Sequence, residues 1–277
     1  MKFKLIIQIG ISIALLMPLG AQATPITNIA ISGTGSYSIY ELPVGQTTGI
    51  LTIQPPTLSA VKDVLMFSTR VGNVQLGTPV LPNAQTNMTV TFTGGSQAIF
   101  SNLLKTDWTD NSFALVHNYI TAAGNSVLMT LTQSQLDDAT NHFLNIAVLP
   151  GIYAWQLASD PSIAAINLVN GHIIVGQDGL FNPVNYLNTL FAGTGAPPAP
   201  SGSQASEVVK VIYDGSTQYL YSFSATSTGY STDDKVSYTG RYTAETIPEP
   251  ATLLLLGIGF IGLTYMRNHK KRDVSKV

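Results

Sequence analysis

The chain has 277 residues, a formal net charge of −2 and no cysteine. Charged residues make up 10% of it, against about 25% in an average soluble protein. This composition excludes disulfides, catalytic thiols and thiolate metal sites, and it argues against a nucleic-acid partner, which would require a basic face.

The first 23 residues have the three parts of a secretory signal peptide. Lys2 and Lys4 give a positive start, an apolar stretch follows, and Ala21 and Ala23 frame an A-x-A cleavage site. We therefore predict cleavage after Ala23 and an exported body that begins at Thr24.

Residues 24–247 form this predicted body, which is acidic. It contains six Lys and Arg residues against thirteen Asp and Glu residues, and it is long enough for one sizeable core. Because few residues are charged, Ser, Thr, Asn and Gln must cover its surface. Such a surface is typical of an extracytoplasmic β-rich protein, and it also suits binding of polysaccharide through hydrogen bonds.

The first half of the body favours β-strands. Several segments are rich in β-branched and aromatic residues, and Pro and Gly residues separate them. Their spacing predicts a mainly β fold, an antiparallel β-sandwich or jelly-roll-like domain. The predicted strands are residues 29–42, 46–53, 61–68, 87–93 and 126–132.

The middle of the body predicts a few short helices. A capping start at 134–137 precedes apolar residues at helical spacing. Asp160 and Pro161 predict a second helix over 160–169, and a third is expected over 183–191. Residues 143–157 also fit a strand.

The last part of the body predicts strands again, after a Gly- and Pro-rich stretch at 193–206. We interpret this stretch as a surface loop, because residues 207–247 are too few for a separate core. Residues 207–213 and 218–225 predict a hairpin around an Asp-Gly turn, followed by a strand at 235–243. These strands are expected to join the sheet that begins near Ile29, which leaves 243–247 as a tether.

Candidate binding residues in the body are few. Tyr219 and Tyr221 fall on one face of a strand, which fits an aromatic platform for glycan or ordinary cross-strand packing. The acidic stretches 107–111 and 233–234 resemble solvated turns or incomplete calcium loops. We therefore predict no bound metal and no cofactor.

No catalytic motif is visible in the body. Asp138 and His142 are four residues apart, so on a helix they share a face, as ordinary surface pairs do. G-x-S-x-G and HExxH motifs are absent from the sequence. We expect the protein not to be an enzyme, with a surface hydrolase centred on His142 as the less favoured alternative.

The C-terminal end has a distinct order of rigid, apolar and basic parts. Pro248-Glu249-Pro250 comes first, and its prolines keep it extended. The uncharged run 251–266 predicts a transmembrane helix of about 24 Å, slightly shorter than the hydrocarbon core of about 30 Å. Residues 273–277 then form a cytoplasmic tail. The predicted cytoplasmic stop before it consists of Arg267, Lys270, Lys271 and Arg272.

This order, over residues 248–272, resembles the PEP-CTERM sorting signal that exosortases recognise in bacteria that export surface polysaccharide. The resemblance implies that Pro248, Glu249 and Pro250 are the recognition tripeptide and that an exosortase-like enzyme processes the chain. Asn268 and His269 interrupt the usual run of arginines.

From the resemblance we expect a protein held in the inner membrane with its body outside the cytoplasm, and after processing at the cell surface or in the extracellular matrix. A structural or adhesive role in the exopolysaccharide layer is the main hypothesis. A carbohydrate-binding module is the alternative.

Overall fold

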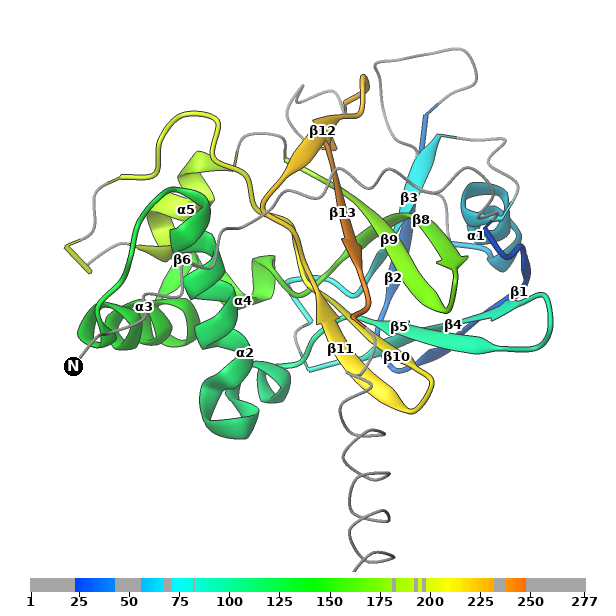
Figure 1. Cartoon of the computed structure of the whole chain (residues 1–277), viewed down its shortest axis with the longest axis horizontal. Coiled ribbons are helices and arrows are strands. Elements are labelled where there is room, and N and C mark those ends of the chain that lie inside the picture. Colours follow the sequence, from blue (N-terminus) through cyan, green and yellow to red (C-terminus); the bar gives the residue numbers. More distant parts are fainter. Residues whose placement is uncertain are drawn as a thin grey trace, which may run out of the picture.

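The computed structural model describes residues 23–42, 56–66, 71–81, 83–180, 183–191, 194–195, 198–231 and 238–247. Within these ranges the regular structure consists mainly of two antiparallel sheets, with a group of helices beside them (Figure 1). The mainly β character that the sequence predicts is therefore confirmed.

One sheet has five strands among the described residues, in the order β1-β4-β5-β10-β11, and each neighbouring pair is antiparallel. β10 and β11 form the hairpin predicted around Asp214 and Gly215. Its pairing with β5 returns it to the sheet that contains β1, as expected. The strands are β1 (Ile26–Gly33), β4 (Thr86–Phe92), β5 (Gln97–Ser101), β10 (Val209–Tyr213) and β11 (Ser216–Leu220).

The other sheet has six strands in the described part of the chain, in the order β12-β13-β9-β8-β3-β2, again with antiparallel neighbours. The strands are β2 (Tyr37–Glu41), β3 (Gly72–Leu76), β8 (Ser162–Val169), β9 (His172–Gly179), β12 (Ala225–Ser227) and β13 (Gly240–Glu245).

The two sheets share one apolar core. β4 shows the alternation that places every second side chain inside, and its inward residues are fully buried. Helix α1 (Leu58–Leu65) adds its apolar face to the same core. Its fully buried members include Ile29, Met88, Val90, Phe92 and Phe100 of the five-stranded sheet and Ile39, Val74, Leu76, Ile163 and Val175 of the six-stranded sheet.

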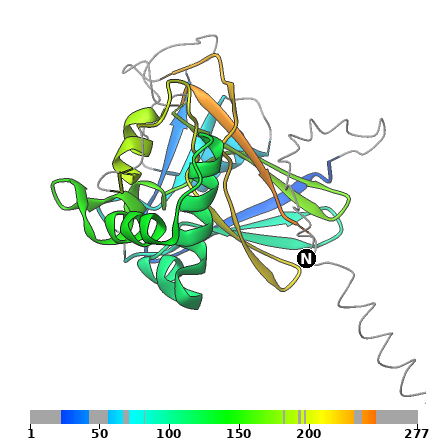
Figure 2. The same ribbon diagram turned by 60° about the vertical axis from the view of Figure 1, so that its left-hand side comes forward.

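A second core lies among the helices at one end of the sheets (Figures 1 and 2). Trp108, Tyr119 and Phe143 are its largest fully buried side chains, and their rings meet edge to face or tilted. The elements here are α2 (Lys105–Ser126), α3 (Gln133–Asn145), β6 (Ala147–Leu149), β7 (Ile152–Tyr153), α4 (Ala154–Leu157) and α5 (Val184–Leu190).

Local sequence explains where α3 begins. Thr132 accepts a hydrogen bond from the Gln135 amide at 3.3 Å, and the Gln135 side chain accepts one from the Thr132 amide at 3.0 Å. This capping box begins two residues before the predicted start at Ser134. The predicted third helix is confirmed as α5.

Two predicted strands are wrong. Residues 61–65 lie in α1, because Thr57 caps the helix and the buried Val61, Val64 and Leu65 follow helical spacing. Residues 126–132 form the end of α2 and a turn, in which Leu128 has a φ of 61° and is almost fully exposed. Helix α2 was not predicted; it is interrupted at residues 110–113, whose φ/ψ values are not helical.

The predicted helix over 160–169 is also wrong, because these residues form β8. A register shift between Ile163 and Ala165 places Ile163 and Ile166 on the same face of the strand, although they are three residues apart. Such a bulge gives a strand the apolar spacing of a helix. Pairing with β9 and β3 on its two sides fixes the extended backbone.

Two further boundaries differ from the prediction. Residues 29–42 contain two strands in different sheets, with Gly33 at the turn between them. The predicted tether at 243–247 is not a free linker: β13 continues to Glu245, and Thr246 accepts a hydrogen bond from the Ile173 amide at 2.9 Å. Residues 46–53 lie outside the described ranges.

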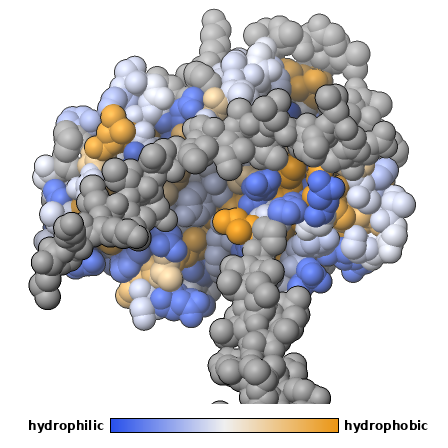
Figure 3. Space-filling model, in the orientation of Figure 1, coloured by the Kyte–Doolittle hydropathy of each residue, from blue (hydrophilic) through white to orange (hydrophobic). Residues whose placement is uncertain are grey.

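The surface fits the low charge of the sequence. Figure 3 shows polar residues over much of the coloured part of this face, with apolar residues in small separate groups. No helix within the described ranges is both long and apolar enough to span a membrane. The predicted span at 251–266 lies outside those ranges.

Candidate functional site

A cavity of about 290 Å³ lies where the helices meet the six-stranded sheet; we call it the Glu207 cavity. Its wall combines one carboxyl group, three tyrosine rings and apolar side chains. Residues from α2, α4, α5, the end of β9 and the segments before β10 and β13 line it. They are Tyr119, Leu157, Ala158, Gly179, Leu180, Pro183, Tyr186, Ala205, Ser206, Glu207 and Tyr238.

Backbone hydrogen bonds on both sides hold Glu207 in place. The Ser206 amide donates to the Ser222 carbonyl at 2.9 Å, and the Val208 amide donates to the Ala158 carbonyl at 2.8 Å. The Ser162 amide donates to Glu207 Oε2 at 2.8 Å. Glu207 therefore bridges the sheet and the helices, and the surface that it retains faces the cavity.

Asp160 is the second acid of this region and is 4% exposed. Its Oδ2 accepts a hydrogen bond from Gln75 Nε2 at 2.6 Å, whereas its Oδ1 has no partner among the described residues. Burial raises the pKa of Asp160, and the Gln75 hydrogen bond lowers it only in part.

Glu207 and Asp160 interact electrostatically. Burial raises the pKa of Glu207 well above its usual value, the negative charge of Asp160 raises it further, and the Ser162 hydrogen bond opposes both effects. In the described part of the chain, no Lys, Arg or His forms an ion pair with either acid. Burial and their mutual repulsion thus shift both carboxyl groups toward their protonated forms.

Two of the tyrosines in the wall differ in their hydrogen bonds. The Tyr119 hydroxyl donates to the Ser206 carbonyl at 2.9 Å. The buried Tyr186 hydroxyl lies near that of Tyr119, but no group within the described ranges satisfies hydrogen-bond geometry with it.

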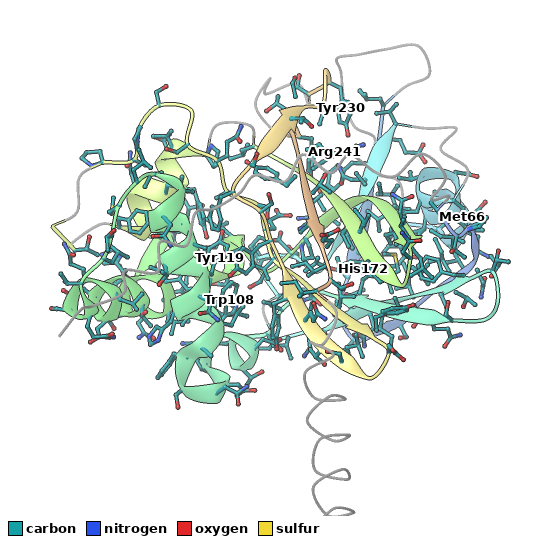
Figure 4. The ribbon with its side chains drawn as sticks, in the orientation of Figure 1. Met66, Trp108, Tyr119, His172, Tyr230 and Arg241 are labelled. Atoms are coloured by element: carbon teal, nitrogen blue, oxygen red, sulfur yellow. The ribbon has the colours of Figure 1, made fainter. Side chains whose placement is uncertain are left out.

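A second polar cluster lies near the cavity on the six-stranded sheet. Asp178 of β9 faces Arg241 of β13, and Tyr230 completes the group (Figure 4). The guanidinium donates to both Asp178 oxygens, at 2.7 and 3.0 Å, and to the Tyr230 hydroxyl at 2.9 Å. Here, unlike at Glu207, a cation balances the buried carboxylate.

The two tyrosines of the predicted glycan platform lie against the helical core. Tyr221 meets Tyr119 edge to face, with 5.1 Å between ring centroids. The Tyr219 hydroxyl donates to Asp107 Oδ1 at 3.0 Å. Both are partly buried, so packing occupies these rings, and glycan binding by them stays a prediction.

One interpretation of residues 107–111 is an incomplete calcium loop, but the structure does not place Asp107 in such a loop. It lies in the first turn of α2, where its Oδ2 accepts the Leu104 amide at 2.8 Å. Its Oδ1 also accepts from Lys210 Nζ at 2.7 Å. Protein donors therefore occupy the carboxylate, and no group of three or more possible metal-binding side chains occurs in the described ranges. Residues 233–234 lie outside them.

His142 and His172 lie in different surroundings. His142 is half-buried on α3, and His172 Nδ1 lies 3.2 Å from the Thr246 carbonyl. No described histidine lines the Glu207 cavity. The Asp138–His142 pair lies on α3 as predicted, with Asp138 exposed.

Sequence reasoning missed the cavity. It counted Glu207 and Asp160 only as acids, and it placed Asp160 at a helix start. One signal was available: Glu207 is the only charged residue between 179 and 209, and it directly precedes an apolar strand. An isolated acid beside a core strand is a candidate buried group.

Most residues that are predicted to direct sorting lie outside the described ranges. The exception is Ala23, which is the first described residue. Those outside the ranges are Ala21, Pro248, Glu249, Pro250 and the residues of the cytoplasmic stop.

The comparisons with curated proteins and with solved structures gave no match. A family comparison matched residues 246–271, at the C-terminal end, where the sequence predicts the signal. The chain thus carries the PEP-CTERM protein-sorting motif, which supports its export and sorting by an exosortase-like system.

Proposed function

We propose that this protein is a structural or adhesive component of the exopolysaccharide layer, without catalytic activity. Its body, residues 24–247, is exported after removal of the signal peptide. A transmembrane helix at 251–266 holds it in the inner membrane until an exosortase-like enzyme processes the tail. It then resides at the cell surface or in the extracellular matrix.

The observation that carries this proposal is the sorting motif at 246–271, directly after the folded body. The body is hydrogen bonded as far as Ile247, whose amide donates to Gln218 Oε1 at 2.8 Å and whose carbonyl accepts from Gln218 Nε2 at 2.7 Å. Pro248 is the next residue. The predicted recognition tripeptide therefore follows the folded body directly in the sequence.

Composition supports a role outside the cytoplasm. Charged residues are 10% of the chain, so the polar surface depends on hydroxyl and amide groups. These groups hydrogen-bond to sugars without requiring a charged ligand. Broad and weak binding of polysaccharide is the expected consequence.

Cell fractionation tests the sorting. Full-length protein should occur in the membrane fraction of cells that lack the processing enzyme, and a chain that ends at Ile247 should be exported in soluble form. A variant with Ala at positions 248–250 is the matched control, because it keeps the span but loses the recognition tripeptide. In cells with the enzyme it should remain uncleaved in the membrane.

Mass spectrometry of the mature C-terminus then locates the cleaved bond. Membrane association of the chain that ends at Ile247, equal to that of the full-length chain, would refute the proposed anchor. Exopolysaccharide pull-down tests the role of the body: weak binding to several polysaccharides supports it, and a complete lack of binding contradicts it.

A further inference from the structure

Glu207, in the wall of the cavity, and the neighbouring Asp160 have no cationic partner among the described residues. Elsewhere in the described part of the chain, buried acids have basic partners: Arg241 binds Asp178, and Lys210 binds Asp107. Glu207 and Asp160 have none, and amides supply their hydrogen bonds. An ionised carboxylate buried without a cation is costly. A positively charged ligand in the cavity would remove that cost.

The rest of the wall also suits a cation with an apolar body. Tyr186 and Tyr238 are half-buried and bring two aromatic rings to the wall, whereas Tyr119 is fully buried. Leu157 and Leu180 add apolar surface. Aromatic faces attract cations, most strongly where water is excluded, and sets of aromatic rings recognise alkylammonium groups. The volume of about 290 Å³ is near the lower limit of about 300 Å³ for small-molecule sites, so a single small ligand fits.

A sugar fits the cavity less well. Its hydroxyl groups would need many hydrogen-bond partners, but the protein itself already occupies most polar groups of the wall. Tyr119 donates to Ser206, the Ser206 amide donates to Ser222, and one Glu207 oxygen accepts from Ser162. An alkylammonium ion needs few hydrogen bonds, so it leaves few groups unsatisfied.

We propose that the Glu207 cavity binds a small organic ammonium ion, with its charge against the Glu207 carboxylate and its alkyl groups against the rings of Tyr186 and Tyr238. Binding is linked to proton release. The Glu207 carboxyl group gives its proton to solvent and becomes the carboxylate that pairs with the ligand, which keeps its own charge throughout. Affinity therefore rises with pH, because less work is needed to remove the proton.

Calorimetric titration of the full-length chain with choline tests this proposal, in a detergent that has no ammonium group. We expect saturable binding at one site, at least tenfold tighter at pH 8 than at pH 6. Titrations in two buffers of different ionisation enthalpy should show proton release. The neutral analogue 3,3-dimethyl-1-butanol, which has the same shape without the charge, should bind at least tenfold more weakly.

Two variants assign the binding to the cavity. Glu207→Gln keeps the shape and the Ser162 hydrogen bond, and it should weaken choline binding at least tenfold and abolish the pH dependence. Tyr186→Leu removes one ring and should weaken choline binding more than that of the neutral analogue. Glu245→Gln, at an exposed position of β13, is the matched control and should bind like the wild type.

Several results would overturn the proposal. These are no saturable choline binding at millimolar concentration, equal binding of choline and the neutral analogue, or unchanged binding in both cavity variants. Tighter binding of glucose than of choline would identify the cavity as a sugar site instead. Because Tyr186→Leu leaves Glu207 intact, the proposal stays testable if Glu207→Gln fails to fold.

Discussion

Arg241 and Asp178 lie opposite each other in the pairing of β13 with β9, and the guanidinium binds both carboxylate oxygens, at 2.7 and 3.0 Å. The Asp178 side chain is fully buried, whereas 34% of the Arg241 side chain is exposed. Burial raises the pKa of Asp178, and the contacts with Arg241 and Tyr230 oppose this effect. The pair thus joins the C-terminal strand to the centre of the six-stranded sheet, next to the start of the sorting motif.

Replacing Arg241 with Met should destabilise the body strongly, because Asp178 would stay buried without a cation. We expect the free energy of unfolding to fall by about 3 kcal/mol, as for other broken buried pairs. Chemical denaturation measures this loss. The double variant Arg241→Met/Asp178→Asn should recover part of it, since no charge then remains unpaired. An unchanged unfolding midpoint in Arg241→Met would contradict this account of the pair.

Asp107→Ala should destabilise the contact between α2 and the five-stranded sheet. The carboxylate accepts from the Leu104 amide, Lys210 and Tyr219, so the variant loses the helix cap and two further hydrogen bonds. We expect a loss of about 3 kcal/mol in unfolding free energy. Tyr219→Phe, which removes one of the three bonds, should cost about 1 kcal/mol. Equal losses in the two variants would show that Asp107 does not act through all three partners.

The sequence predicts those features that depend on neighbouring residues. The hairpin at Asp214 and Gly215 follows from an Asp-Gly pair between two β-rich segments, and both residues have positive φ in the structure. The sorting motif is likewise a contiguous pattern, and the family comparison confirms it. Local chemistry of this kind can be recognised without knowledge of the fold.

Other features depend on residues far apart in the chain. Two helices and two loop segments bring Tyr119, Tyr186, Glu207 and Tyr238 to one cavity, and no local sequence pattern predicts that they meet. The same is true of β8, whose bulge hides its alternation and whose extended form depends on pairing with β3 and β9. Tertiary contacts of this kind override local propensity.

Gly33→Ala should be among the most damaging single changes in the turn between β1 and β2. Gly33 has a φ of 109°, and an added Cβ would lie 2.2 Å from the Gln85 carbonyl oxygen. Strain and a backbone clash therefore act together. Gly95 is the matched control, because its φ is 88° but its Cβ would meet nothing within 4 Å.

We expect Gly95→Ala to cost about 1 kcal/mol of unfolding free energy, the penalty of left-handed backbone alone. Gly33→Ala should cost clearly more, because β1 must shift away from β4. Denaturant unfolding of the two variants side by side makes this comparison. Equal losses would mean that the turn absorbs the clash without disturbing the sheet.

The acids of the cavity should make stability depend on pH. In the folded protein, burial raises the pKa of both Glu207 and Asp160, whereas in the unfolded chain their pKa values are about 4.3 and 3.9. Below about pH 4 both states hold the protons, and the stabilisation is complete. As pH rises above this value, the unfolded chain loses protons that the folded protein retains, so the free energy of unfolding falls.

The double variant Glu207→Gln/Asp160→Asn cannot lose these protons, so its stability should depend less on pH. Its melting temperature, relative to the wild type, should rise between pH 5 and pH 8 by several degrees, since about 1 kcal/mol corresponds to about 2–4 °C in a chain of this size. Calorimetric melts across this range measure the difference, and other titrating groups cancel because both proteins contain them. Glu245→Gln, at an exposed site, should have the same melting temperature as the wild type at each pH. A relative melting temperature that stays constant or falls with pH would show that the buried carboxyl groups ionise freely in the folded protein, which would contradict their isolation from cations.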